Sequence, residues 1–154
     1  SVEIAKCEAD EVTRVIKQVA EKHKVGQSNI VYDADGLGSF LRGYLRNAKP
    51  FNNGAKPIGR KNYKNLKSQC GYELAKVINA KEIFIDCDID KSEMIKELEC
   101  LQSYALDTDG KIQLMPKSKI KELIGHSPDK LDALIMRMYF VVKPIGTWGS
   151  SRAS

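Results

Sequence analysis

The chain has 154 residues, 42% of them hydrophobic, which gives it the length and apolar content of one compact domain with a core. No run of 18 apolar residues and no charged-then-apolar N-terminal segment occurs, so nothing in the sequence points to a membrane span or to secretion and a cytoplasmic protein is expected. The net charge is +5, and four scattered cysteines without C-x-x-C spacing favour reduced, buried thiols over disulfides or a zinc site.

The first elements predicted are a helix, a strand and a second helix joined by an acidic turn. Residues 10–24 place apolar side chains on one helical face. Residues 30–33 indicate a short buried strand that ends at Asp33, and Gly36 and Gly38 allow a tight turn into a helix starting at Leu37. These residues alone leave two interpretations open, an ordinary turn with solvated aspartates or a functional site.

Positive charge is concentrated between residues 39 and 72, which contain eight basic residues and no acid. Without these eight, 17 basic residues stand against 20 acidic ones, a net charge of −3. The segment could be a solvated lysine-rich surface, but the absence of acids favours contact with the phosphates of double-stranded DNA. The predicted nucleic-acid-binding residues are Arg42, Arg46, Lys49, Lys56, Arg60, Lys61, Lys64 and Lys67.

The same segment is predicted to contain a long loop at residues 47–61 and a helix at residues 62–79. Lys61, Lys64 and Lys67 gather at the expected start of this helix, where positive charge opposes the helix dipole. We therefore expect an anionic ligand to compensate them.

A strand, a helix, a hairpin and a short helix are expected next, at residues 83–85, 90–103, 104–115 and 117–124. Asp107 and Asp109 in the hairpin are interpreted as turn residues rather than metal ligands. The last helix is predicted from Pro128 to Val142, with Ser127 as its N-cap.

This last helix carries two acids. Asp129 and Asp132 are three residues apart and share a face. Asp129 is a common kind of first-turn acid, whereas Asp132 lies at the edge of the apolar stripe, where a carboxylate is costly unless it is paired or bound to metal. Asp132 is therefore interpreted as part of a site. Residues 146–154 are expected to form a flexible tail.

Four blocks of the chain resemble the nuclease domain of phage terminase large subunits, which cut concatemeric DNA during genome packaging. One block has the pattern D-x-x-G-x-G from Asp33, and another has S-P-D-x-x-D-A-L from Ser127. The blocks follow the order of the family and lie at residues 31–40, 51–54, 62–68 and 125–134.

The resemblance implies an α/β fold of the RNase H-like type, a mixed sheet flanked by helices, over residues 1–145. It implies a metal-dependent endonuclease that cleaves double-stranded DNA by two-metal phosphodiester hydrolysis. Asp33, Asp129 and Asp132 are then the catalytic and metal-binding residues, and Mg²⁺ or Mn²⁺ suits their hard oxygen ligands. The implied setting is the cytoplasm of a bacterial host, with an ATPase domain, the small terminase subunit and the portal as partners.

Two departures from the family pattern keep a second hypothesis open. The family's first catalytic aspartate lies on a strand before the first helix, so we expect this chain to be N-terminally truncated and to lack one ligand. No G-x-x-x-x-G-K-[ST] motif occurs, so motor activity is not assigned. The alternative is a non-catalytic DNA-binding or docking module. Dinucleotide binding and an EF-hand both fail, because Leu41 and Tyr44 occupy positions that require glycine and glutamate.

Overall fold

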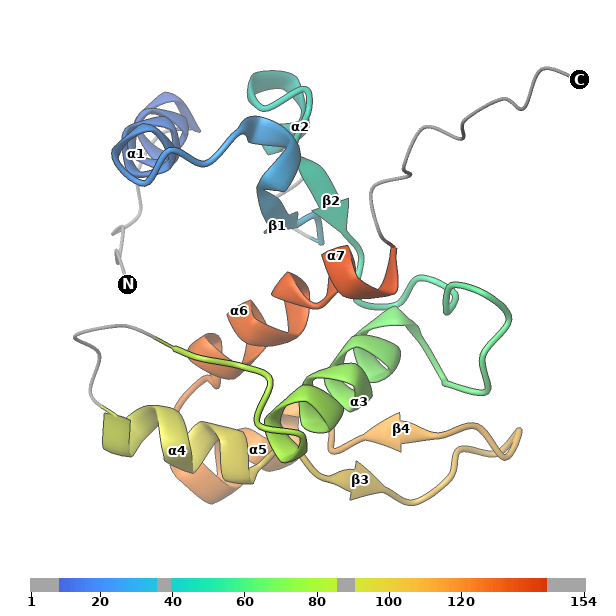
Figure 1. The fold of residues 1–154 in the computed structure, drawn as a ribbon. Helices are drawn as coiled ribbons and strands as arrows, with labels where there is room; N and C mark the ends of the chain where they lie inside the picture. Colours follow the sequence, from blue (N-terminus) through green and yellow to red (C-terminus); the bar gives the residue numbers. More distant parts are fainter. Residues whose placement is uncertain (1–8, 36–39, 86–90, 144–154) are drawn as a thin grey trace, which may run out of the picture.

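The computed structural model describes residues 9–35, 40–85 and 91–143, which form a mixed α/β fold in which helices predominate (Figure 1). The predicted α/β class is therefore confirmed. In chain order the elements are α1 (Ala9–Lys22), a 3-10 helix (Gln27–Asn29), β1 (Val31–Asp33), α2 (Leu41–Tyr44), β2 (Lys49–Phe51), α3 (Leu66–Asn79), α4 (Lys91–Glu99), β3 (Ser103–Tyr104), β4 (Gln113–Leu114), α5 (Lys117–Ile124), α6 (Asp129–Arg137) and α7 (Tyr139–Val142).

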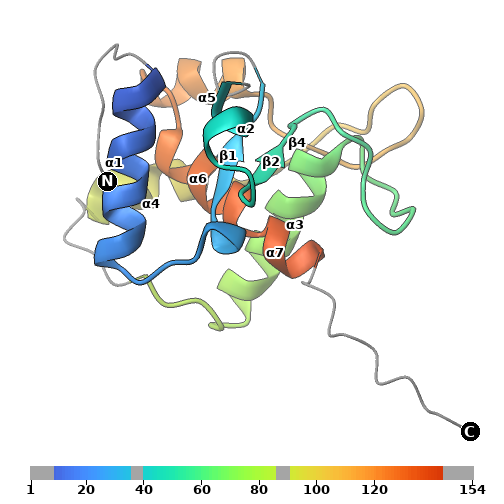
Figure 2. The same ribbon diagram turned by 90° about the horizontal axis from the view of Figure 1, so that it is seen from above.

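Helix α6 lies at the centre of the molecule. It packs against α3 and α4 on one side and against β1 on the other (Figures 1 and 2). The main core surrounds it and consists of Phe51, Leu66, Cys70, Leu74, Cys100, Ile120, Leu131, Ile135 and Met138. A smaller core formed by Tyr32, Leu41, Leu45 and Ala48 lies where β1 and α2 meet α1. Helix α6 therefore joins the part of the molecule that contains α3 and α4 to the part that contains β1.

Strands β1 and β2 are parallel, with Val31 opposite Lys49 and Asp33 opposite Phe51. The prediction of an unbroken loop at residues 47–61 is therefore wrong. Pro50 has no N–H to donate and normally argues against a strand, but β2 pairs on one side only in the described sheet, where proline is tolerated. Phe51 is fully buried and anchors the strand. The carboxyl ends of β1 and β2 consequently lie at one edge.

Helix α3 begins at Leu66, four residues later than predicted. Asn65 caps it, since its Oδ1 accepts a hydrogen bond of 2.9 Å from the Ser68 N–H. Tyr63 instead forms an isolated bridge with Ile112. Lys61 and Lys64 therefore precede the helix, and only Lys67 lies in its first turn.

Helix α6 does not use Ser127 as its cap, contrary to the prediction. Pro128 is the N-cap residue, and no side chain within the helix start caps it. Instead, Glu97 of α4 accepts a 2.8 Å hydrogen bond from the Leu131 N–H. Glu97 is only 1% exposed. A buried carboxylate 34 residues earlier in the chain therefore stabilises the start of α6. The expected single helix to Val142 is divided at Met138, where α6 ends and α7 begins.

The remaining predictions have mixed outcomes. Helices α1 and α5 and the β3–β4 hairpin are confirmed, and Asp107 Oδ1 accepts bonds from Asp109 N and Lys111 N as a turn residue does. Helix α4 is present, but it ends at Glu99, four residues before its predicted end. The strand at residues 83–85 is wrong, because nothing in the described chain pairs with it and Phe84 is 87% exposed. Predictions for Gly36, Leu37, Gly38 and residues 146–154 lie outside the described residues.

Cys70 and Cys100 are free and buried, as expected. Burial, aided by the charge of Glu73, raises the pKa of the Cys70 thiol to about 12, so it stays protonated at neutral pH. Cys7 and Cys87 lie outside the described residues. None of the helices in the described ranges combines the length and apolar character needed to cross a membrane.

The Glu97 cap gives a prediction about stability. Glu97→Ala leaves the Leu131 N–H without its acceptor and should lower the free energy of unfolding by about 2 to 3 kcal/mol in urea titrations. Glu97→Gln keeps an acceptor and should lower it less. Glu99→Ala, at an exposed position on the same helix, is the control and should change it by less than about 0.5 kcal/mol. Equal effects of Glu97→Ala and Glu99→Ala would contradict the capping role.

Candidate functional site

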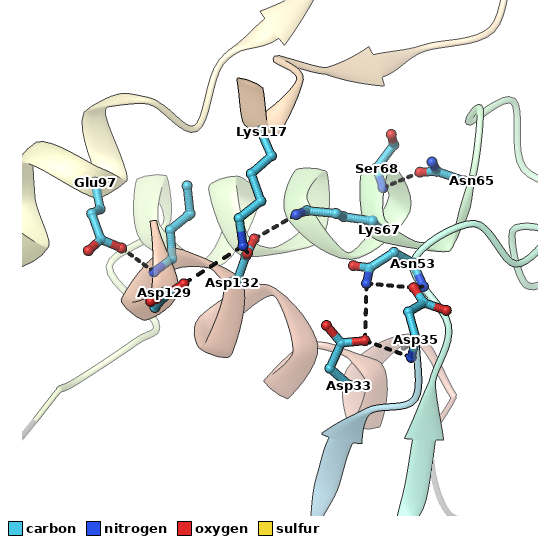
Figure 3. A network of polar contacts seen from close by, with 11 residues as sticks. Asp33, Asp35, Asn53, Asn65, Lys67, Ser68, Glu97, Lys117, Asp129 and Asp132 are labelled. Carbon is cyan, nitrogen blue, oxygen red and sulfur yellow. Dashed lines mark hydrogen bonds and ion pairs between the residues drawn. The ribbon is translucent and has the colours of Figure 1, made fainter. Parts of the chain in front are cut away.

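The carboxyl ends of β1 and β2 hold one group of polar side chains. Asp33 Oδ1 accepts hydrogen bonds from Asp35 N at 3.0 Å and from Asn53 Nδ2 at 3.3 Å. Asp35 Oδ2 accepts from both Asn53 N, at 3.0 Å, and Asn53 Nδ2, at 2.8 Å. Asn53 therefore joins the two acids (Figure 3). These donors are neutral, so they orient Asp33 without cancelling its charge.

A second group surrounds Asp132 on the first turn of α6. Its Oδ1 accepts from Lys67 Nζ and its Oδ2 from Lys117 Nζ, both at 2.6 Å. Lys67 belongs to the first turn of α3, and Lys117 is the first residue of α5. The Asp132 side chain is 20% exposed, and two positive charges compensate its partial burial. Asp129 is 79% exposed and lies 3.7 Å from Lys117.

Lys117 connects the two groups electrostatically. Burial acts to lower the pKa of its ammonium group, but the hydrogen bond to Asp132 and the charges of Asp132, Asp129 and Asp33 raise the pKa above its ordinary value. Helix α6 also packs against β1, which carries Asp33. All three predicted carboxylates therefore act on one cationic group.

In the described part of the chain, the carboxylate oxygens of Asp33, Asp129 and Asp132 do not form a group in which all three lie within 4.8 Å of one another. Within those ranges, the group of three whose possible ligand atoms lie within 4.8 Å of one another is Glu93, Glu97 and His126. In that group Glu97 caps α6, and Lys130 lies 2.5 Å from Glu93. These contacts account for both acids as an ion-pair network at the start of α6.

The predicted DNA-binding cations occupy different environments. Arg42, Arg46, Lys56, Arg60 and Lys61 are exposed, and Lys49 is half-buried. Lys64 donates to Gln113 Oε1 at 2.8 Å. Lys67 is committed to Asp132, so a carboxylate of the protein supplies the compensating anion that was expected from a ligand at the start of α3.

Sequence reasoning gave no role to Asn53 or Lys117. Asn53 lies in the loop block at residues 51–54, for which no residue was given a role, and its contact with Asp35 spans 18 residues. Lys117 carried a usable signal, because it begins a helix and its charge opposes the dipole just as that of Lys67 does. An acid near Lys117 could have been inferred from this position.

Comparison with known proteins gives no further information on the site, because no protein-family model and no curated protein matches the chain.

The ion pairs of Asp132 predict an unusual response to its neutralisation. Removing a carboxylate from a cluster of unpaired acids relieves repulsion, but Asp132→Asn removes the counter-ion of two lysines. It should therefore lower the free energy of unfolding by about 1 kcal/mol in urea titrations at low salt. Asp129→Asn, at an exposed position, should change it by less than about 0.5 kcal/mol. A stabilising effect of Asp132→Asn would contradict the arrangement.

Proposed function

We propose that this chain is part of a terminase-type nuclease domain, a metal-dependent endonuclease that cleaves double-stranded DNA by phosphodiester hydrolysis. The observation that carries the proposal is the position of Lys117. It is a cation that contacts Asp132 at 2.6 Å and Asp129 at 3.7 Å, both in the first turn of α6, and the charge of Asp33 at the end of strand β1 also stabilises it. A position that stabilises an ammonium group also suits a divalent cation with oxygen ligands.

The chemistry of the side chains fits Mg²⁺ or Mn²⁺. Asp33 Oδ2 receives no hydrogen bond from any described residue, and Asp132 offers two hard oxygens that bind cations already. Asp33 and Asp132 would therefore hold the metal, with Asp129 at the exposed side. When bound, such ions activate water and stabilise the leaving oxygen. Asn53 and the Asp35 N–H would orient Asp33 through its other oxygen.

The RNase H-like part of the proposal needs more strands than the two-stranded sheets described here. The hydrogen bonds from Lys49 N to Ile30 O and from Ala34 N to Phe51 O direct alternate backbone groups of β1 toward β2. The backbone groups of Val31 and Asp33 then face the other side, where no described strand lies. This unpaired edge supports a further strand beside β1, and that strand could carry the third carboxylate of the family.

The alternative, a non-catalytic DNA-binding or docking module, is favoured by two observations. Both oxygens of Asp132 are neutralised by lysines, and the three predicted ligands do not form a compact set among the described residues. Metal binding distinguishes the two proposals, since the alternative requires none.

The metal site can be tested by calorimetric titration with Mn²⁺. The chain should bind Mn²⁺ weakly, and Asp33→Asn and Asp132→Asn should each lower the affinity by at least about tenfold. Asp109→Asn, which alters an exposed turn carboxylate paired with Lys111, should leave it unchanged. Any Mn²⁺-dependent cleavage of plasmid DNA by the chain should be lost in Asp132→Asn. Unchanged Mn²⁺ affinity in both aspartate variants would exclude the proposed site.

The DNA-binding role can be tested separately through salt dependence. Neutralising Arg60 and Lys61, as Arg60→Gln with Lys61→Gln, should weaken binding to duplex DNA and reduce the slope of log K against log salt by up to about 1.8, because each lost phosphate contact contributes about 0.9. The matched control is Lys22→Gln with Lys24→Gln, two exposed cations at the end of α1. If the two pairs had the same effect, the loop after β2 would have no special part in binding.

A further inference from the structure

The two lysines bound to Asp132 occupy the positions that a metal ion needs. Lys67 Nζ and Lys117 Nζ each lie 2.6 Å from a different oxygen of this carboxylate. A divalent cation that approaches Asp132 is therefore repelled by two ammonium groups at close range. Binding of the metal requires that at least one lysine leaves.

The surroundings of the two lysines identify which one leaves. The Lys67 side chain is 23% exposed, and its backbone N–H is bonded to Asn53 O, which ties this turn of α3 to the loop after β2. The Lys117 side chain is 41% exposed and extends from the first residue of α5. Moving Lys117 into solvent therefore disrupts less packing than moving Lys67. Lys117 is thus the exchangeable cation, and Lys67 the fixed one.

The charge of the group supports an exchange rather than an addition. Three carboxylates and two ammonium groups give Asp33, Asp129, Asp132, Lys67 and Lys117 a net charge of −1. Adding a divalent cation while both lysines remain bound would make this net charge positive, whereas release of Lys117 leaves the carboxylates neutralised by the metal and Lys67. The released ammonium stays tethered to α5 beside the metal. A lysine in that position is a mobile point charge suited to a phosphate oxygen.

We propose that a divalent cation displaces Lys117 from Asp132 and that the released Lys117 then binds a phosphodiester group of double-stranded DNA. Metal and DNA therefore bind with positive coupling, since each favours the state in which Lys117 has left Asp132. The inference rests on the proposed function for the metal and the DNA, and it adds Lys117 as the residue that connects them.

The exchange is tested by Mn²⁺ titration of the full chain. Lys117→Met removes the competing charge and keeps an unbranched side chain, so Mn²⁺ should bind about fivefold more tightly. Lys117→Arg retains the charge and should bind Mn²⁺ no more tightly than the unaltered chain. The matched control is Lys111→Met, because Lys111 is 43% exposed and also pairs with an aspartate. Lys111→Met should leave the Mn²⁺ affinity unchanged.

The coupling is tested by fluorescence anisotropy with a short labelled DNA duplex, with and without Mn²⁺. Mn²⁺ should raise the DNA affinity of the unaltered chain and of Lys111→Met. In Lys117→Met this Mn²⁺-dependent gain should be lost, although Mn²⁺ binds more tightly. A gain of equal size in Lys117→Met would overturn the phosphate-binding role.

The outcomes separate this inference from the proposed function. Equal Mn²⁺ affinities of the unaltered chain and Lys117→Met, with a loss in Asp132→Asn, would overturn the exchange and keep the metal site. No Mn²⁺ binding by any variant would overturn both. If Lys117→Met does not fold, mass-spectrometric amine labelling of the unaltered chain decides, since Mn²⁺ should increase labelling of Lys117 relative to Lys111. Unchanged relative labelling at saturating Mn²⁺ would contradict the exchange.

Discussion

The hydrogen bond from the Leu131 N–H to the buried Glu97 carboxylate fixes where α6 begins, and the candidate site depends on that point. Helix α6 packs against α3, α4 and β1, and its first turn carries Asp129 and Asp132. Successive residues of an α-helix are rotated by about 100°. If the residue before or after Leu131 took its place against Glu97, the helix would be rotated by this angle and Asp132 would point away from Lys67 and Lys117. The cap thus contributes both to stability and to the direction in which the site carboxylate points.

The two principal acids of the site are stabilised in different ways, which suits different roles. Asp33 is oriented by neutral donors, from Asn53 and from the Asp35 backbone, and keeps its negative charge available. Asp132 is compensated by two lysines from the first turns of α3 and α5. In this account, Asp33 attracts a cation and Asp132 exchanges one. The lysines also remove the repulsion that an assembled group of carboxylates would otherwise impose on the fold.

Local signals in the sequence predicted the elements whose causes are local. Helix α5 ends at Gly125, which has a φ of 81°, and the turn of the hairpin is stabilised by a bond from the nearby Asp109 N–H to the Asp107 carboxylate. The end of α5 and the turn were therefore predictable from local sequence. Strand β2 and the cap of α6 depend on residues distant in the sequence. Locally, Pro50 argued against a strand and Ser127 suggested a cap that the helix does not use. The same limit applies to the site. Asp33 and Asp132 were predicted from the end of a strand, the edge of an apolar stripe and the order of the motifs, whereas the pairing of Lys67 and Lys117 with Asp132 joins residues 65 and 15 positions apart.

The central claim is that carboxylates of β1 and α6 form one cation site that lysines occupy in the absence of metal. The most direct measurement is the anomalous scattering of a crystal soaked in Mn²⁺. The account predicts a manganese peak in contact with Asp33 and Asp132, with Lys117 Nζ moved away from Asp132. A peak only at Glu93, Glu97 and His126, or no peak while Lys67 and Lys117 remain on Asp132, would contradict it.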